Sequence, residues 1–403
     1  MQIKKNISRS YQDVADRLLC RPCIGIPFFF LLIFTVFYLT FSGPGAYSVH
    51  FLEILFFQIS EALRTFLINI GTNVFLIKLL IDGIFLGVSS VLAYLPQTAI
   101  LFFLLAFLED SGYMARAVFV MDRVMRTAGL SGRAVLPFLI GFGCSVPAVM
   151  SAETLEDKEK ESVVFSLSFI PCNARLPVLL FLVSSCFRVH TAEIAAGFYL
   201  LSVFVAFLSA LVFASKRKNV SELPLILKLP RYRLPRIRDL WREVRNKLRD
   251  FFIRAGTVVF LSSASICLLS MITPAFRLAE STDESILAVL GNAAAPIFSF
   301  LGFGNGSIIA ALAAGFFAKE SIVSVLAILL PDGIAAVLTP AGAVSVIAFS
   351  MLYTPCAATL SAARRVLSGK KALLFLLRTF FFAAAVSWVL YILTYLFLTH
   401  CTK

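Results

Sequence analysis

The sequence predicts an all-α protein whose helices form a polytopic transmembrane bundle, and three observations support this class. Hydrophobic residues make up 59% of the 403 residues and charged residues only 15%. Soluble domains average roughly 45–50% apolar and about 25% charged residues, so a soluble multidomain enzyme is disfavoured. Apolar runs recur that are long enough for a helix to cross a hydrocarbon core of roughly 30 Å. Finally, 41 Phe against two Trp suit lipid-facing helices better than base-stacking surfaces.

The first apolar run covers residues 24–41 and follows a basic segment, residues 1–23. Because Lys and Arg stay on the cytoplasmic side of membranes, we expect a cytoplasmic amino terminus. The run is longer than a signal-peptide core and no small-residue cleavage site follows, which predicts a retained helix. Residues 49–70 alternate apolar and polar side chains at helical spacing and indicate an interfacial or re-entrant helix. The stretch 74–108 contains glycines and a proline, and predicts one long broken helix or two short ones.

Later apolar segments predict the remaining spanning helices, for a total of eight to ten. They cover residues 134–152, 161–185, 191–214, 254–274, 286–303, 307–330, 340–362 and 372–398. The predicted organisation has four parts. These are a cytoplasmic segment (1–23), a first helical half (24–215), a basic cytoplasmic loop with an amphipathic helix (216–254) and a second helical half (255–403).

Residues 216–254 differ from the rest of the chain in charge. They contain 13 Lys and Arg against four acidic residues, which accounts for +9 of the formal net charge of +13. Prolines interrupt the start of this stretch, and residues 236–254 read as a basic amphipathic helix that the positive-inside rule places in the cytoplasm. Anionic lipid and a cytoplasmic partner protein are the two favoured contacts, and nucleic acid is disfavoured. The predicted docking residues are Arg231, Arg233, Arg236, Arg238, Arg242 and Arg245.

The two halves of the chain share a short pattern. Gly141-Phe142-Gly143-Cys144 is followed by Pro171-Cys172, and Gly315-Phe316-Phe317-Ala318 is followed by Pro355-Cys356. Each pair is a Gly-Phe element, then a spanning length, then Pro-Cys. Membrane transport proteins are often built from such repeats, with Gly- or Pro-interrupted helices at corresponding positions. The pattern predicts two repeats that contain broken helices.

Three thiols stand beside these interruptions: Cys144, Cys172 and Cys356. Thiols with nearby amide and carbonyl oxygens suit a borderline divalent transition metal better than Mg²⁺ or Ca²⁺, which prefer oxygen ligands. The competing interpretation is that they are small buried side chains, since buried structural cysteines are usually inert.

Ionisable side chains in apolar segments supply further candidates, because such groups are costly in lipid and usually line a pathway or a bundle interior. Glu109 and Asp110 indicate a cation-attracting vestibule, or else a helix end that pairs with Arg116. Lys319 and Glu320, predicted inside one apolar helix, indicate a gate or else a structural ion pair. The remaining pathway or gating candidates are Tyr113, Ser145 and Asn173.

Motifs for nucleotide or hydrolytic chemistry are not found in the sequence. No G-x-x-x-x-G-K-[ST] motif occurs, and Gly369-Lys370-Lys371 lacks both the upstream glycine and the hydroxyl. No Ser, His and Asp arrangement suggests a catalytic triad. We therefore expect a protein that is not an enzyme, with no nucleotide site and no permanently bound cofactor.

At these motifs the sequence resembles the membrane region of the bacterial ferrous iron transport protein B family. The resemblance extends from about residue 12 to the second Pro-Cys pair. It includes Asp16-Arg17-Leu18-Leu19, Leu95-Pro96-Gln97, Leu108 to Arg116, Met121-Asp122-Arg123, Gly141-Phe142-Gly143-Cys144, Ala174-Arg175-Leu176-Pro177, Leu229-Pro230, Ala318-Lys319-Glu320 and Pro355-Cys356.

The resemblance implies a fold with two gate-like repeats and the import of Fe²⁺, as transported substrate, across the bacterial cytoplasmic (inner) membrane. The pore cysteines of the family fall on Cys144, Cys172 and Cys356. Family members carry a GTP-binding domain before the membrane region. We expect this chain to work without a GTPase domain of its own, and its expected partners are a separate GTP-binding protein, a small cytoplasmic accessory protein or further copies of itself.

Two other hypotheses remain at this stage. One keeps the fold and changes the cargo to Mn²⁺, Co²⁺ or Zn²⁺, since a fold does not determine a substrate. The other is a non-transporting membrane scaffold or sensor that docks a separate GTPase. The three thiols distinguish a transport protein from a scaffold, because a transport pathway needs all three to face one cavity and a scaffold does not.

Overall fold

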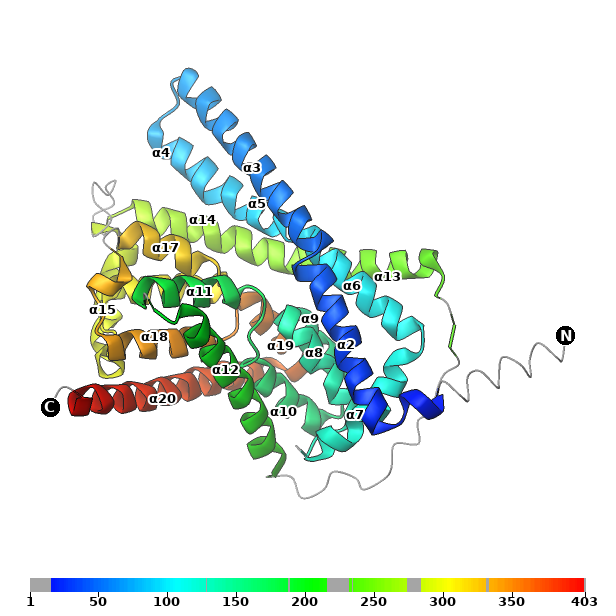
Figure 1. Ribbon diagram of the computed structural model, residues 1–403. Helices are drawn as coiled ribbons and strands as arrows, with labels where there is room; N and C mark the ends of the chain where they lie inside the picture. Colours follow the sequence, from blue (N-terminus) through cyan, green and yellow to red (C-terminus); the bar gives the residue numbers. More distant parts are fainter. Residues whose placement is uncertain are drawn as a thin grey trace. The chain divides into compact units, whose positions relative to one another are not determined.

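The computed structural model describes residues 16–127, 129–187, 189–215, 232–233, 235–273, 284–330 and 333–401. These residues form α-helices with short 3₁₀ and π segments and no β-strand, which confirms the predicted all-α class (Figure 1). Arg231 and the rest of the basic stretch before it, from residue 216, lie outside the described residues. The chain groups into two compact units, each assembled from separate stretches of sequence. The division into four parts along the chain stays a prediction.

The first unit contains the described residues of Met1–Ile70, Val88–Leu136 and Leu211–Thr257. Helix α6 is central to it, because four other helices pack against α6. The helices of this unit are α2 (Pro22–Phe41), α3 (Pro44–Asn69), α6 (Leu95–Asp110), α7 (Tyr113–Thr127) and α13 (Ile237–Phe251). Proline is the first or second residue of α2, α3 and α6, where its missing N–H has no intrahelical partner to lose.

Helix α13 confirms the predicted amphipathic helix. Leu240 and Val244 are buried against α6, whereas Ile237 and Trp241 are exposed. The predicted docking residues Arg236, Arg238, Arg242 and Arg245 are also exposed on this helix or at its start. The side that does not pack against α6 therefore combines arginines with a large aromatic ring.

The second unit contains the described residues of Gly71–Gly87, Pro137–Ala210 and Val258–Lys403. Its core is α18, in which nearly every residue from Ala341 to Leu352 is buried, and which packs against α20 and α11. The helices of this unit are α4 (Val74–Ile77), α8 (Val135–Gly143), α9 (Ser145–Ser151), α10 (Asp157–Leu167), α11 (Arg175–Cys186), α12 (Thr191–Ser215), α14 (Thr257–Met271), α15 (Ile286–Phe298), α16 (Gly306–Phe317), α17 (Ser321–Leu329), α18 (Pro340–Leu352), α19 (Ala357–Leu367) and α20 (Gly369–Cys401).

Aromatic rings fill the space around α18. Phe349 on α18 lies against Phe303 and Phe380, with ring centroids 5.6 Å and 5.8 Å away. Phe298 on α15 contacts the same three rings. Aromatic pairs at these separations add stabilisation beyond the burial of their surface, so this cluster holds α15, α18 and α20 together.

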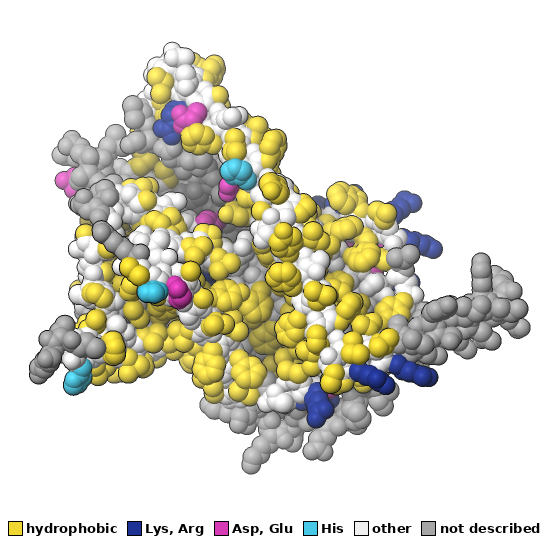
Figure 2. All heavy atoms as spheres, in the orientation of Figure 1, with side chains coloured by type: hydrophobic (Ala, Val, Ile, Leu, Met, Phe, Trp, Pro, Cys, Tyr) yellow, Lys and Arg dark blue, Asp and Glu magenta, His cyan; other side chains and the backbone are white. Residues whose placement is uncertain are grey.

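The surface of the helices agrees with a membrane environment. Large hydrophobic side chains stay exposed on α2, including Phe30, Leu31 and Phe34, and on α20, including Phe381 and Phe397. The face drawn in Figure 2 is covered largely by hydrophobic side chains. Soluble proteins rarely expose such extensive apolar surface, so these helices are suited to contact lipid.

Among the described residues, the helices that could span a membrane by length and composition number three to six, against the predicted eight to ten. Three helical stretches in the described residues are long and apolar enough to cross a membrane: Pro22–Asn69, which consists of α2 and α3, Thr191–Phe213 and Gly369–His400. Three bent pairs raise the number to six: Leu95–Asp110 with Tyr113–Thr127, Ile286–Leu301 with Gly306–Phe317, and Pro340–Leu352 with Ala357–Leu367. The difference arises because several segments predicted as single spans are split by breaks into pieces shorter than a bilayer.

The predicted segment 307–330 shows this correction most clearly. It is not one helix, because Ala318 to Glu320 separate α16 from α17. The segment 74–108 divides at Tyr94, since α4, a π-helical stretch (Lys78–Phe85) and α5 (Leu86–Ala93) run on from one another and α6 follows. The predicted segment 49–70 falls in the 26-residue helix α3 except for its last residue, and the helix length of about 39 Å exceeds the thickness of a bilayer core.

Candidate functional site: the meeting point of four helix breaks

The two predicted repeats have matching breaks in the second unit. Cys144 separates α8 from α9 with φ −150° and ψ 129°, and Ala318 follows α16 with φ −139° and ψ 120°. Each is a single extended residue that directly follows a Gly-Phe element. The Pro-Cys pairs form the second break of each repeat, before α11 and before α19. The sequence pattern thus corresponds to repeated local geometry.

Hydrogen bonds connect the two breaks within each repeat. In the first repeat the Asn173 N–H donates to the Gly143 carbonyl at 3.2 Å. In the second repeat the Lys319 amine donates to the Thr354 carbonyl at 2.7 Å. The hydrogen bond that joins the two breaks is therefore donated by a main-chain N–H in the first repeat and by a lysine side chain in the second.

Arg175 connects the first repeat to the second. Its guanidinium donates to the Ser168 carbonyl at 2.8 Å and to the Tyr353 carbonyl at 2.9 Å, and the residue is only 3% exposed. An arginine is suited to this position because its rigid fork can bind two acceptors at once. All four breaks are therefore joined by polar contacts at one place in the second unit.

The three predicted thiols lie at this meeting point. Cys144 and Cys172 each neighbour one end of the Asn173-to-Gly143 hydrogen bond, Cys356 follows Thr354 by two residues, and each of the three is partly buried. Among the described residues, however, no group of three or more His, Cys, Asp or Glu side chains is arranged to hold a metal ion. The thiols are thus neighbours without forming a closed set of ligands in this conformation.

Other candidates surround the thiols. Lys319 is 3% exposed and its amine lies 3.3 Å from the centre of the Tyr353 ring. Glu320 is partly buried and directly precedes α17. Ser145 and Asn173 are partly buried beside their breaks. Arg175 and the Tyr353 and Thr354 carbonyls belong to broken segments that the sequence indicates, but the partners of Arg175 and Lys319 there were not predicted.

Glu109, Asp110 and Tyr113 belong to the first unit and not to this meeting point. They lie where α6 turns into α7 by 85°, around Gly112, whose φ of 82° is in the left-handed region that glycine adopts readily. Glu109 is exposed. Asp110 is 3.7 Å from the Arg233 guanidinium, and Tyr113 is buried edge-on against Phe28.

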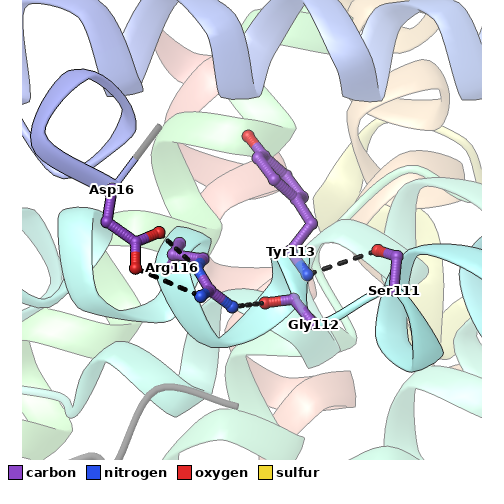
Figure 3. A network of polar contacts seen from close by, with 5 residues as sticks. All are labelled: Asp16, Ser111, Gly112, Tyr113 and Arg116. Carbon is purple, nitrogen blue, oxygen red and sulfur yellow. Dashed lines mark hydrogen bonds and ion pairs between the residues drawn. The ribbon is translucent and has the colours of Figure 1, made fainter. Parts of the chain in front are cut away.

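Arg116 pairs with Asp16 at this corner, a partner that the sequence did not indicate. The guanidinium donates to the two carboxylate oxygens of Asp16 at 2.9 Å and 3.3 Å and to the Gly112 carbonyl at 2.7 Å (Figure 3). It also lies 3.8 Å from the centre of the Tyr232 ring. Burial raises the pKa of Tyr232 to about 12, so this ring stays neutral at cellular pH.

Two protein-family descriptions match the chain. "Nucleoside recognition" (Gate) matches residues 91–186 and 252–370, which together are more than half of the chain. "Ferrous iron transport protein B C terminus" matches residues 195–247. The first covers all four helix breaks, and the second includes most of α12 and the start of α13.

Curated relatives are similar over most of the chain. A Staphylococcus aureus protein named Fe(2+) transporter FeoB is 36% identical over 359 residues, which cover 87% of this chain and 54% of the relative. A protein of the same name from Methanocaldococcus jannaschii is 33% identical over 376 residues, covering 90% and 55%. A Porphyromonas gingivalis Fe(2+) transport protein A/Fe(2+) transporter FeoB fusion protein is 28% identical over 443 residues, covering 96% and 51%. The chain thus spans about half the length of the curated relatives it matches, and no solved structure matches it.

Proposed function

This chain belongs to the ferrous iron transport protein B family, and on that premise we propose that it conducts Fe²⁺ across a membrane through the meeting point of the four helix breaks. What supports the proposal is that Cys144, Cys172 and Cys356 adjoin helix breaks that hydrogen bonds connect, where the Tyr353 and Thr354 carbonyls accept from Arg175 and Lys319. Irregular backbone at membrane depth is tolerated where it is buried in protein or lines a pathway.

The donor chemistry supports an iron cargo. Thiols bind soft or borderline divalent metals, and carbonyl oxygens replace part of the water shell of an entering ion. A conducting path needs binding that is favourable enough to admit the ion and weak enough to release it.

Mn²⁺, Co²⁺ and Zn²⁺ remain alternative cargoes, because the same donors accept them. In the proposed topology the protein is multi-pass in the bacterial inner membrane with its amino terminus in the cytoplasm. The exposed arginines of α13 then face anionic lipid or a cytoplasmic protein. The fusion of a transport protein A to one relative supports a small accessory protein as that partner.

Uptake of Fe²⁺ into proteoliposomes tests the proposal. The protein is reconstituted without nucleotide, under a reductant that keeps iron ferrous, and compared with a Cys144→Ser/Cys172→Ser/Cys356→Ser variant. We expect the triple variant to lose most of the uptake because a hydroxyl is a poor ligand for a borderline metal. Cys186→Ser is the matched control, since Cys186 is a partly buried thiol at the end of α11.

Three outcomes separate the hypotheses. Uptake that survives the triple substitution would contradict a thiol-lined path. Uptake of Zn²⁺ or Mn²⁺ in preference to Fe²⁺, with the same thiol dependence, would change the cargo and keep the path. No uptake of any of these ions by a folded wild-type protein would favour the scaffold hypothesis or the need for a GTPase partner, and adding the accessory and GTP-binding proteins would separate those two.

A further inference from the structure

One side of helix α13 carries a row of exposed apolar side chains. Ile237 and Trp241, one turn apart, are 77% and 62% exposed, and Phe252 directly after the helix is 41% exposed. Three turns of an α-helix take about 11 residues, so Trp241 and Phe252 point in the same direction. The half-buried Leu248 lies between them on this side. These four residues form an apolar row that packing against α6 leaves exposed.

The arginines of α13 form a second row beside the first. Residues at spacings of four, three and four fall on one side of an α-helix, and four exposed arginines follow this spacing. The arginine row consists of Arg238, Arg242, Arg245 and Arg249. Asp239 and Glu243 fall beyond it, on the side away from Trp241. The arginine row therefore borders the apolar row directly, and these acidic residues face away from both.

This arrangement separates the predicted docking residues into two groups. Arg238, Arg242 and Arg245 lie in the arginine row, which the sequence analysis did not extend to Arg249. Arg236 stands one turn before the buried Leu240 and so belongs to another side of the helix. The Arg233 guanidinium is 3.7 Å from the Asp110 carboxylate, at the corner between α6 and α7.

Helix α13 lies beside an apolar helix of the first unit. It packs along α6, whose residues from Leu95 to Leu108 are all uncharged (Figure 1). The chain reaches α13 at the carboxyl end of α6, where the Arg233 N–H donates to the Ser111 carbonyl at 3.4 Å. Charge is costly in hydrocarbon, and a large exposed apolar surface is costly in water. An arginine-rich helix held against an apolar one is therefore best accommodated where lipid headgroups meet hydrocarbon.

The two rows fit a membrane surface better than a protein partner. Tryptophan is enriched at membrane–water interfaces, and arginine binds phosphate oxygens with paired N–H groups. A helix with arginines beside exposed tryptophan and aliphatic side chains is typical of those that lie in the plane of the interface. The apolar row also continues to Phe252, five residues before the apolar helix α14. Lipid covers the whole of this row, whereas a cytoplasmic protein would cover only its start.

We propose that the arginine row binds the headgroups of anionic phospholipids in the cytoplasmic leaflet, and that Ile237 and Trp241 enter the interface beside it. The inference rests on the topology in the proposed function, and it selects lipid from the two contacts named there. It does not depend on the transported ion.

Trp241 can report this contact, because the sequence contains one other tryptophan, Trp388 on α20. The 403-residue chain with Trp388→Phe is reconstituted into nanodiscs of three parts phosphatidylcholine to one part phosphatidylglycerol. A nitroxide high on the acyl chain, which quenches tryptophan at the interface, is carried by one lipid or the other in equal amount. We expect labelled phosphatidylglycerol to quench Trp241 several-fold more than labelled phosphatidylcholine does.

Two charge-matched pairs of substitutions locate the binding. Arg242→Gln/Arg245→Gln removes two charges from the arginine row. Each basic residue near an anionic surface strengthens the attraction up to about fivefold, so this pair should bring the two labels close to equal quenching. Arg236→Gln/Lys247→Gln removes the same charge from another side of the helix, where Lys247 pairs with Glu243, and should leave the preference unchanged.

Salt provides a test that needs no change in the arginine row. Raising the ionic strength from about 0.1 M to about 1 M shortens the Debye length from about 10 Å to about 3 Å, so the preference for phosphatidylglycerol should fall. A preference that salt leaves unchanged would overturn the proposal. This measurement also replaces the arginine variant if that variant does not fold.

A cytoplasmic protein as the true occupant gives a different result. In nanodiscs that contain this chain alone, Trp241 would then be quenched by acrylamide in the water and by neither lipid label, which overturns the proposal. Equal quenching of Trp241 by the two labels would show an apolar contact without headgroup binding, and also overturns it. An equal loss of preference in both charge-matched pairs would overturn the assignment to the arginine row.

The proposed function and this inference fail separately, because the quenching measurement needs no Fe²⁺. Uptake that does not depend on the thiols, together with the expected quenching, would remove only the proposed path. Thiol-dependent uptake together with a Trp241 that neither lipid label quenches would remove only the lipid contact.

Discussion

We expect the ion pair between Arg116 and Asp16 to stabilise the first unit. Removing Asp16 should lower the free energy of unfolding more than removing Arg116 does. The side chain of Arg116 is 3% exposed and that of Asp16 is 26% exposed. Asp16→Ala leaves a buried guanidinium without its carboxylate, whereas Arg116→Met leaves a carboxylate that water can reach. The cost of breaking a pair depends on the charge that stays behind.

The contacts of the two side chains determine how much stability each substitution should remove. Removal of one partner of a buried pair costs about 3–5 kcal/mol, and we expect Asp16→Ala to reach the lower end, because Arg116 keeps the Gly112 carbonyl and the Tyr232 ring. Arg116→Met should cost about 2 kcal/mol, since hydrogen bonds to charged groups contribute about 1.5–3 kcal/mol each but Asp16 regains water. The double variant should cost less than the sum of the two, by about 1–3 kcal/mol.

Unfolding in mixed detergent micelles, followed by circular dichroism, measures these differences. Arg126→Met is the matched control, because Arg126 pairs with Asp122 one turn away on the same helix and its side chain is 34% exposed. Such a pair contributes about 0.3–0.5 kcal/mol. The reasoning is refuted if Asp16→Ala costs no more than Arg116→Met, or if the coupling falls to the level of the control.

Two further substitutions test local features of the structure. Gly112→Ala should destabilise the protein by about 1 kcal/mol, because Gly112 has φ 82° and an L-residue is strained there; an unchanged denaturation midpoint would show that the 85° turn does not need glycine. Tyr353→Phe should cost about 1 kcal/mol, since the hydroxyl donates to the Leu312 carbonyl at 3.2 Å, yet should keep Fe²⁺ uptake because the ring beside Lys319 remains. Loss of uptake in a stable Tyr353→Phe protein would assign the hydroxyl to the path.

The sequence predicts those breaks that carry chemical markers. Gly143 and Pro147 flank the break at Cys144, and Pro171 and Pro355 stand immediately before the other two thiols. Glycine and proline weaken a helix by their own backbone properties, so neighbouring residues are enough to locate such a break. The amphipathic pattern of α13 is equally local, which is why its bounds fall within the predicted 236–254.

The remaining features depend on residues that are far apart in the sequence. Ala318 to Glu320 contain neither glycine nor proline, so periodicity runs on through a break that tertiary contacts impose. Arg116 is 100 residues from Asp16, and Arg175 is 178 residues from Tyr353. In a straight helix Arg116 would be expected to pair with nearby Glu109 or Asp110. The chain turns at Gly112, so these residues do not lie on one continuous helix with Arg116.

The need to satisfy buried carbonyls connects the fold of the second unit to its proposed activity. Every helix break at membrane depth frees main-chain oxygens, and these must find donors or cations because lipid offers none. In the second unit Arg175 donates to the Ser168 and Tyr353 carbonyls, and Lys319 donates to the Thr354 carbonyl. Under the proposed function, an ion that passes these breaks meets thiols beside the same carbonyls, a mixed set of oxygen and sulfur donors that suits Fe²⁺ better than an ion that binds oxygen alone.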